Sequence, residues 1–223
     1  MCLSKAFSCR ERLDAKVNAA FMPVDPEAIL AQFYSPGGRT RALLQRHGEL
    51  VARKALTVLD RAPWLTADRA FVHQAAMLHD VGIGRTRCPE LGCAGALPYV
   101  HHGVEGRRML DGLGLASHGL VCERHVGVGI SAEEAAFQQL DLPNRDMLPL
   151  SVEERLICYA DKFFSKTDNG RHEKTIAEIL VGLSRYGPVM TDRFLALHRL
   201  FTEAPDRAVD RLTQRLSKET HDL

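Results

Sequence analysis

The sequence predicts an all-α protein, a single-domain helical bundle. Apolar residues recur three or four positions apart along most of the chain, which is the period of a helix with one buried face. Signals that start helices are repeated from end to end, whereas no run of β-branched residues alternates in the way a half-buried strand requires. A chain of 223 residues can bury a substantial core without disulfides or a structural metal.

The first helices are expected in the N-terminal half. Residues 25–27 (Asp-Pro-Glu) place an N-cap residue, a proline at the first helical position and an acid in the first turn. Residues 35–38 (Ser-Pro-Gly-Gly) break the chain before a long helical segment, 39–60, whose apolar residues share one face. A further helix is expected to begin at Thr66-Ala67-Asp68 and to run towards His79.

The second half continues the pattern. The segment 88–98 is rich in Gly, Cys and Pro and predicts a loop. Ser131 and Ser151 are each followed three residues later by a glutamate, which is the capping-box pattern at a helix start. The remaining expected helices cover about 99–111, 117–125 and two or three stretches within 172–217, including 176–183 and 194–201.

These elements predict an N-terminal extension of residues 1–24 and a helical domain of residues 25–223, with C-terminal helices over 172–217. Residues 1–22 carry too many charges for a secretory signal, and no stretch of about 18 apolar residues is present, so a cytoplasmic protein without membrane contact is expected. Lys plus Arg number 29 and Asp plus Glu number 28, and this balance predicts no nucleic-acid partner. The apolar C-terminal helices would allow a homodimer.

Polar side chains on apolar helix faces are the most informative residues. His47 lies three residues after Leu44 and four before Val51, on the inward face of its helix. His79 and Asp161 also lie three or four residues from apolar residues of their own helices, so both are expected to point inward from two other helices. Asp80 follows His79. Each alone has an ordinary explanation, as a satisfied core histidine, a cap or a turn residue. A buried carboxylate is costly unless it is paired or bound to metal, so the four together favour a metal site.

The pattern His47 … His79-Asp80 … Asp161 resembles the ligand set of the HD superfamily of metal-dependent phosphohydrolases. Residues 81–84 (Val-Gly-Ile-Gly) resemble the HDIG branch, although Val81 replaces the usual isoleucine. The resemblance covers about residues 39–166. It extends to the histidine-containing stretches 99–110 and 123–127, and the segments 129–135 and 159–162 resemble an uncharacterised subgroup. The resemblance implies a metal-binding core over about 39–167, with the 88–98 loop as part of a substrate lid.

The resemblance also implies one or two divalent transition metal ions. His47, His79, Asp80 and Asp161 would hold the first, and imidazole with carboxylate suits Mn, Fe, Co, Ni or Zn. His102 and His125 would hold a second ion, with Asp80 between the two. His101 and His102 point about 100° apart on a helix, and His102 is preferred because Gly106, one turn later, leaves room for close packing. His118 is expected to have a structural role.

The expected activity is phosphohydrolysis through a metal-bound hydroxide. The expected substrate is small and nucleotide-like, with a phosphomonoester, phosphodiester or phosphoanhydride bond. His79 and Asp80 would be catalytic, Arg85 would hold phosphate, and of Lys162 and Lys166 one, taken as Lys166, would reach the pocket. Two alternatives remain open at this point: a di-iron oxygenase on the same ligands, and a non-catalytic nucleotide-binding regulatory module. Motifs of P-loop, dinucleotide-binding and serine-hydrolase enzymes are absent from the sequence.

Overall fold

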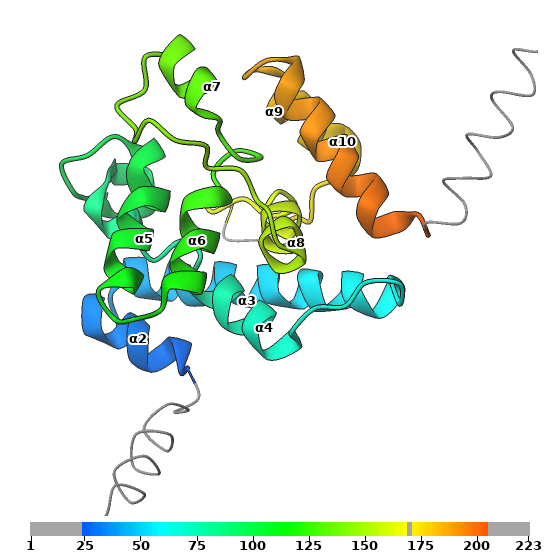
Figure 1. Ribbon diagram of the computed structural model, residues 1–223. Coiled ribbons are helices and arrows are strands. Elements are labelled where there is room, and N and C mark those ends of the chain that lie inside the picture. The colour runs from blue at the N-terminus through cyan, green and yellow to red at the C-terminus, as the bar shows by residue number, and fades with distance from the viewer. Residues whose placement is uncertain (1–23, 169–170, 205–223) are drawn as a thin grey trace, which may run out of the picture.

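The computed structural model describes residues 24–168 and 171–204, which form a mainly helical molecule. This confirms the predicted predominance of helices. The predicted extension, apart from Val24, and the predicted helical region after residue 204 lie outside the described residues. Figure 1 shows α5 and α6 side by side above the long helix α3, with α8 at the centre and α9 and α10 on the far side of it. The α-helices are α2 (Pro26–Phe33), α3 (Arg39–Arg61), α4 (Arg69–Leu78), α5 (His102–Asp111), α6 (Ala116–Arg124), α7 (Ala132–Phe137), α8 (Val152–Asp161), α9 (Ile176–Ser184) and α10 (Pro188–Thr202).

Side-chain caps begin several of these helices where the sequence predicts them. The Asp25 carboxylate accepts a hydrogen bond from the backbone N–H of Glu27, and Asp68 caps α4 in the same way. The capping box predicted at Ser131 is complete, with the side chain of Glu134 accepting from the backbone N–H of Ser131. At Ser151 the pattern is only half formed, because the glutamate three residues later accepts from the N–H of Leu150 instead.

The predicted loop 88–98 contains a small antiparallel hairpin. Strands β1 (Arg87–Cys88) and β2 (Cys93–Ala94) pair around the 3₁₀ turn η2 (Pro89–Leu91). Gly92 closes this turn with a positive φ of 77°, a conformation that favours glycine. Strands of two residues are too short to show an alternating pattern, so they could not be predicted from the sequence. Two further 3₁₀ turns, η1 (Ile83–Arg85) and η3 (Tyr99–His101), precede and follow the hairpin.

Two hydrophobic clusters meet along α3. The larger cluster joins the C-terminal part of α3 to α4, α8, α9 and α10, and the smaller joins the N-terminal part of α3 to α2, α5 and the turn after α4. Leu44 belongs to the smaller cluster and Val51 to the larger, so His47 lies on α3 where the two adjoin. The described part of the chain contains no helix that is both long enough and apolar enough to cross a membrane.

Candidate metal centre

Six buried side chains from five helices or helix ends converge between the two clusters. They fall into two groups whose ligand atoms lie within 4.8 Å of one another, and one carboxylate belongs to both groups. The first group is His47, His79, Asp80 and Asp161, and the second is Asp80, His102 and His125. These are the residues that the sequence analysis selected as metal ligands, and the structure brings all six together.

Helix ends position five of the six side chains. His79 and His125 directly follow α4 and α6, His102 is the first residue of α5, and Asp161 is the last residue of α8. The turn after Asp80 packs directly on α5, because a Cβ atom at Gly82 would lie 2.1 Å from the carbonyl oxygen of His102. Only glycine allows this approach, which brings Asp80 beside the α5 histidine.

The first group is arranged around the carboxylates of Asp80 and Asp161. His47 Nε2 lies 2.8 Å from Asp161 Oδ1 and 3.5 Å from Asp80 Oδ2. His79 Nε2 lies 3.2 Å from Asp80 Oδ2 and 3.4 Å from Asp161 Oδ1. Two nitrogens and two oxygens therefore face a common point.

The second group uses the other oxygen of Asp80. The Nε2 atoms of His102 and His125 both lie 3.4 Å from Asp80 Oδ1 and 3.2 Å from each other. Because Oδ2 faces the first group and Oδ1 the second, Asp80 is placed to bridge two ions.

Backbone carbonyls orient three of the imidazole rings. The Nδ1 atoms of His79, His102 and His125 lie 2.6, 2.7 and 2.8 Å from the carbonyl oxygen three residues earlier in each case. An Nδ1–H that donates to a carbonyl fixes the tautomer with an unprotonated Nε2, which is the form that ligates a metal. Tyr99 supplies one of these carbonyls and also stacks on the His102 ring at 4.6 Å between centroids.

The geometry fits a transition metal. Ligand atoms about 2.1 Å from an ion lie about 3.0–3.4 Å apart in octahedral or tetrahedral arrangements, and most distances within both groups are close to this range. His79 Nε2 and Asp80 Oδ1 are buried without a hydrogen-bond partner among the described residues, and Asp80 Oδ2 has only an ion pair with Lys166. Such orphaned atoms are costly and call for an explanation, which a bound cation provides. Mixed imidazole and carboxylate ligands suit Mn, Fe, Co, Ni or Zn.

Burial and neighbouring charges shift the pKa values of the groups in the centre in different directions. Burial lowers the pKa of His102 to about 3 and that of His47 to about 4, in the latter case with help from Lys166. Burial also opposes charge on His79, but Asp80 outweighs it and raises the pKa of His79 to about 9. Burial opposes the carboxylate form of Asp80 as well, yet His79 and Lys166 hold its pKa well below the ordinary value. The histidines other than His79 are thus neutral and ready to act as ligands, because burial lowers the pKa of His125 too.

Both candidate lysines reach the centre, whereas only one of them, taken as Lys166, was expected to reach the pocket. Lys166 Nζ lies 2.8 Å from Asp80 Oδ2, and Lys162 Nζ lies 2.6 Å from Asp161 Oδ2. Arg85 is not brought to the centre and instead lines a separate hollow beside Tyr34 and Gly84. Arg85 is the last residue of the 3₁₀ turn η1, and the hollow that it lines shares no lining residue with the pocket that contains His102, His125 and Asp161.

Histidines outside the two groups are accounted for separately. His118 packs against Phe71 in a tilted arrangement, with 4.7 Å between ring centroids, and its Nε2 lies 3.3 Å from Gln74 Oε1. His101 is buried but is not a member of either group.

Sequence reasoning missed Tyr34 and Tyr99. The Tyr34 hydroxyl donates to the carbonyl oxygen of Val81 at 2.5 Å and accepts from the N–H of Gly84 at 3.1 Å, which fixes the turn after Asp80. Burial raises the pKa of Tyr34 to about 12, so the hydroxyl remains a donor. No pattern in the sequence links Tyr34 to a turn 47 residues later.

A pocket of about 410 Å³ opens onto one side of the centre. It combines His102, His125, Asp161 and both lysines with an apolar wall. Its polar groups therefore gather at the metal ligands, and the rest of its surface suits an uncharged part of a ligand. The apolar and aromatic wall includes Tyr99, Val100, Val126, Ile130, Leu140, Leu183, Tyr186 and Met190.

The fold and the centre together define a mainly α-helical protein with a buried His/Asp site suited to divalent metal. Comparison with known proteins gives several relatives, of which three are described. The chain is 33% identical over 123 residues to a tRNA (cytidine(56)-2'-O)-methyltransferase of Picrophilus torridus, and 33% identical over 142 residues to the enzyme of that name from Thermoplasma volcanium. These matches cover 55% and 63% of this chain, but 32% and 37% of the relatives.

The third relative is an uncharacterised protein of Methanocaldococcus jannaschii, 36% identical over 101 residues, which are 45% of this chain and 52% of that protein. The chain thus spans about a third to a half of the length of these relatives. No protein-family model matches the sequence. No solved structure matches it either.

These findings correct four expectations. HD superfamily membership is contradicted, because the relatives bear the name of a tRNA methyltransferase and no family model supports the resemblance. Phosphohydrolase activity is contradicted on the same ground, and so is the classification as a hydrolase. The expectation of a small phosphorylated substrate without nucleic acid is wrong as well, because the names specify tRNA. The physical reason is that His and Asp ligands restrict the ion that binds, not the reaction it serves.

Proposed function

We propose that this chain is a divalent-metal-binding helical unit that acts on tRNA in ribose 2'-O-methylation. The observation that carries the metal-binding part is that five buried side chains converge on the carboxylate of Asp80. Some of the polar atoms in this cluster have no hydrogen-bond partner among the described residues. The two relatives named as tRNA (cytidine(56)-2'-O)-methyltransferases support the tRNA part.

The candidate centre fits a role at a ribose hydroxyl. A bound divalent cation lowers the pKa of a hydroxyl that coordinates it, and 2'-O-methylation requires the 2'-hydroxyl as nucleophile. His47, His79 and Asp161 would hold the ion on one side, while the 410 Å³ pocket leaves the other side accessible to a ligand. Lys162 and Lys166 lie at the edge of this opening, where they can neutralise a neighbouring phosphate. We assign no methyl-donor site to this chain, which spans only part of the named relatives.

Metal analysis tests the first part of the proposal. The chain, purified without chelator, should contain about two equivalents of transition metal per molecule by inductively coupled plasma mass spectrometry. Asp161→Ala should lose metal from the first group, because it removes one of four ligands. Absence of metal after reconstitution with Mn, Fe, Co, Ni and Zn would reject the centre.

A tRNA experiment tests the second part. An unmodified tRNA transcript should bind the metal-loaded chain, and chelation should weaken that binding at least about tenfold if the ion contacts the RNA. Radiolabelled S-adenosylmethionine added to the same mixture measures any methyl transfer to cytidine. A metal-loaded chain that neither binds the transcript nor supports methylation would reject the role in tRNA modification while leaving the metal centre intact.

A further inference from the structure

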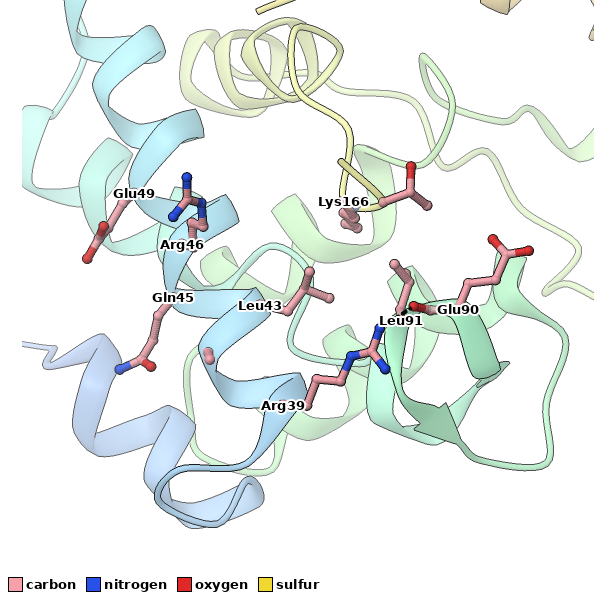
Figure 2. A pocket seen from close by; sticks show the side chains of 10 residues that line it. Arg39, Leu43, Gln45, Arg46, Glu49, Glu90, Leu91 and Lys166 are labelled. Carbon is pink, nitrogen blue, oxygen red and sulfur yellow. Dashed lines mark hydrogen bonds between the residues drawn. The ribbon is translucent and has the colours of Figure 1, made fainter. Parts of the chain in front are cut away.

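A second cavity lies on the other side of Lys166 from the pocket described above. It has a volume of about 720 Å³ and runs between α3 and the η2 turn of the hairpin (Figure 2). Lys166 belongs to the lining of both cavities, so the α3 cleft, as we call this second one, adjoins the candidate metal centre. Its lining residues are Arg39, Ala42, Leu43, Gln45, Arg46, Glu49, Glu90, Leu91, Lys166 and Thr167.

The α3 cleft is lined by three cations, Arg39, Arg46 and Lys166, and by two acidic residues, Glu49 and Glu90, beside a helix that is itself basic. Helix α3 carries six arginines or lysines and only two acidic residues, whereas the full sequence has a formal charge of +1. Arg39 and Arg46 line the cleft from α3, and Lys166 faces them from the segment after α8. Figure 2 shows the carboxylate of Glu90 pointing away from Arg39, whose Nη2 instead donates to the Glu90 carbonyl oxygen at 3.0 Å.

The spacing of the two arginines suits an extended anionic chain better than a single small anion. Arg39 and Arg46 are seven residues apart, which places them on the same side of α3 about 10 Å apart along its axis. A single phosphate cannot span that distance, whereas successive phosphates of one strand can. The cleft lining contains no aromatic residue on which a base could stack, so contacts here would be made to the backbone.

We propose that the α3 cleft binds the phosphodiester backbone of the RNA and leads the strand past Lys166 to the metal centre. This inference rests on the proposed function, because it takes tRNA as the ligand. Arg39 and Arg46 each neutralise a backbone phosphate, and Lys166 contributes a third cation at the junction with the 410 Å³ pocket. Phosphate contacts of this kind position a strand without reading its sequence.

The test measures affinity for an unmodified tRNA transcript at several salt concentrations, with the metal-loaded full chain. Arg39→Gln and Arg46→Gln should each weaken binding about tenfold, and each should reduce the slope of log affinity against log salt by about one. Arg39→Lys should restore most of the affinity, because a phosphate contact needs charge more than a planar fork. The matched control is Arg69→Gln at the start of α4, an exposed arginine that pairs with Asp60 and lies outside the cleft; its affinity should remain within about twofold of the unmodified chain.

The outcomes separate this inference from the function on which it rests. If the unmodified chain binds the transcript and the two glutamine variants bind equally well with the same salt slope, the RNA lies elsewhere and the cleft proposal is overturned alone. If the unmodified chain loads metal but binds no transcript, the tRNA role and the cleft proposal both fall. Metal content and circular dichroism of each variant establish that lost affinity does not reflect lost folding.

Discussion

Glu123 in α6 and Asp80 after α4 are both almost completely buried carboxylates, with side-chain exposures of 1% and 2%, but their partners differ. Each oxygen of Glu123 accepts from an arginine, Arg107 on one side and Arg145 on the other. Asp80 Oδ1 has no hydrogen-bond partner among the described residues, and Oδ2 has only the ion pair with Lys166, while four histidine nitrogens lie 3.2–3.5 Å from the two oxygens. Glu123 therefore ties the loop before α8 to α5 and α6, whereas Asp80 is arranged to receive a cation.

The difference shows how a buried polar cluster can be recognised as functional. Leaving a buried acceptor unsatisfied costs about 1–3 kcal/mol, so native folds rarely keep several together without a compensating ligand. The Glu123 cluster is complete within the protein itself. The Asp80 cluster becomes complete only when an ion joins its ligands.

Replacing Asp80 should give the largest effect. Asp80→Ala removes the only residue shared by both ligand groups, so both ions should be lost, with affinity reduced at least about a hundredfold. Equilibrium dialysis against zinc or manganese measures the loss, and circular dichroism checks the fold. Full retention of two equivalents would show that Asp80 is no bridging ligand and would break the contrast with Glu123.

Replacing His125 should affect only the second group. His125→Ala leaves His47, His79, Asp80 and Asp161 in place, so the metal content should fall from about two equivalents to about one. Metal analysis after reconstitution distinguishes this from complete loss. The matched comparison is His118→Ala; His118 is a buried histidine of α6, the helix that His125 directly follows, belongs to neither group, and its replacement should leave the stoichiometry unchanged.

Metal affinity should rise with pH. Without metal, His79 carries a proton at neutral pH because Asp80 raises its pKa to about 9 against the effect of burial. The metal requires an unprotonated Nε2, so one proton leaves His79 as the ion binds, while His47 and His102 are already neutral. Affinity should therefore increase about tenfold per pH unit between pH 6 and 8 and level off above about 9. Calorimetry in two buffers of different ionisation enthalpy counts the protons released, and a count of zero would refute the assignment.

The sequence was most informative about features that depend on a single residue or a single helix. Helical periodicity and the caps at Asp25, Asp68 and Ser131 predict elements that the structure contains. The inward spacing of His47 and Asp161 predicts that these side chains meet, because a polar residue on an apolar stripe has few other destinations.

Features that depend on contacts between distant segments were not predictable. Tyr34 reaches a turn far along the chain, and Arg85, at the end of a 3₁₀ turn, lines a hollow separate from the centre. The α3 cleft likewise exists only once the hairpin packs beside the helix. The expectation of no nucleic acid is contradicted by the names of two relatives, and the net charge of +1 on which it rested averages over the chain and does not show that α3 is basic.

Replacing Glu123 should give the smallest effect. It tests the other half of the comparison, that Glu123 stabilises the fold and does not hold metal. In Glu123→Gln the neutral amide can no longer balance Arg107 and Arg145, but both arginines are partly exposed, at 29% and 49%, and solvent screens their charge. The loss of stability should be about 1–2 kcal/mol, a decrease in Tm of roughly 5 °C, measured by thermal unfolding of the metal-loaded chain. Metal content should stay at about two equivalents, because Glu123 is not a member of either ligand group. A variant that melts normally but loses metal would show that the two buried carboxylates do not have separate roles, since Glu123 would then position the neighbouring His125.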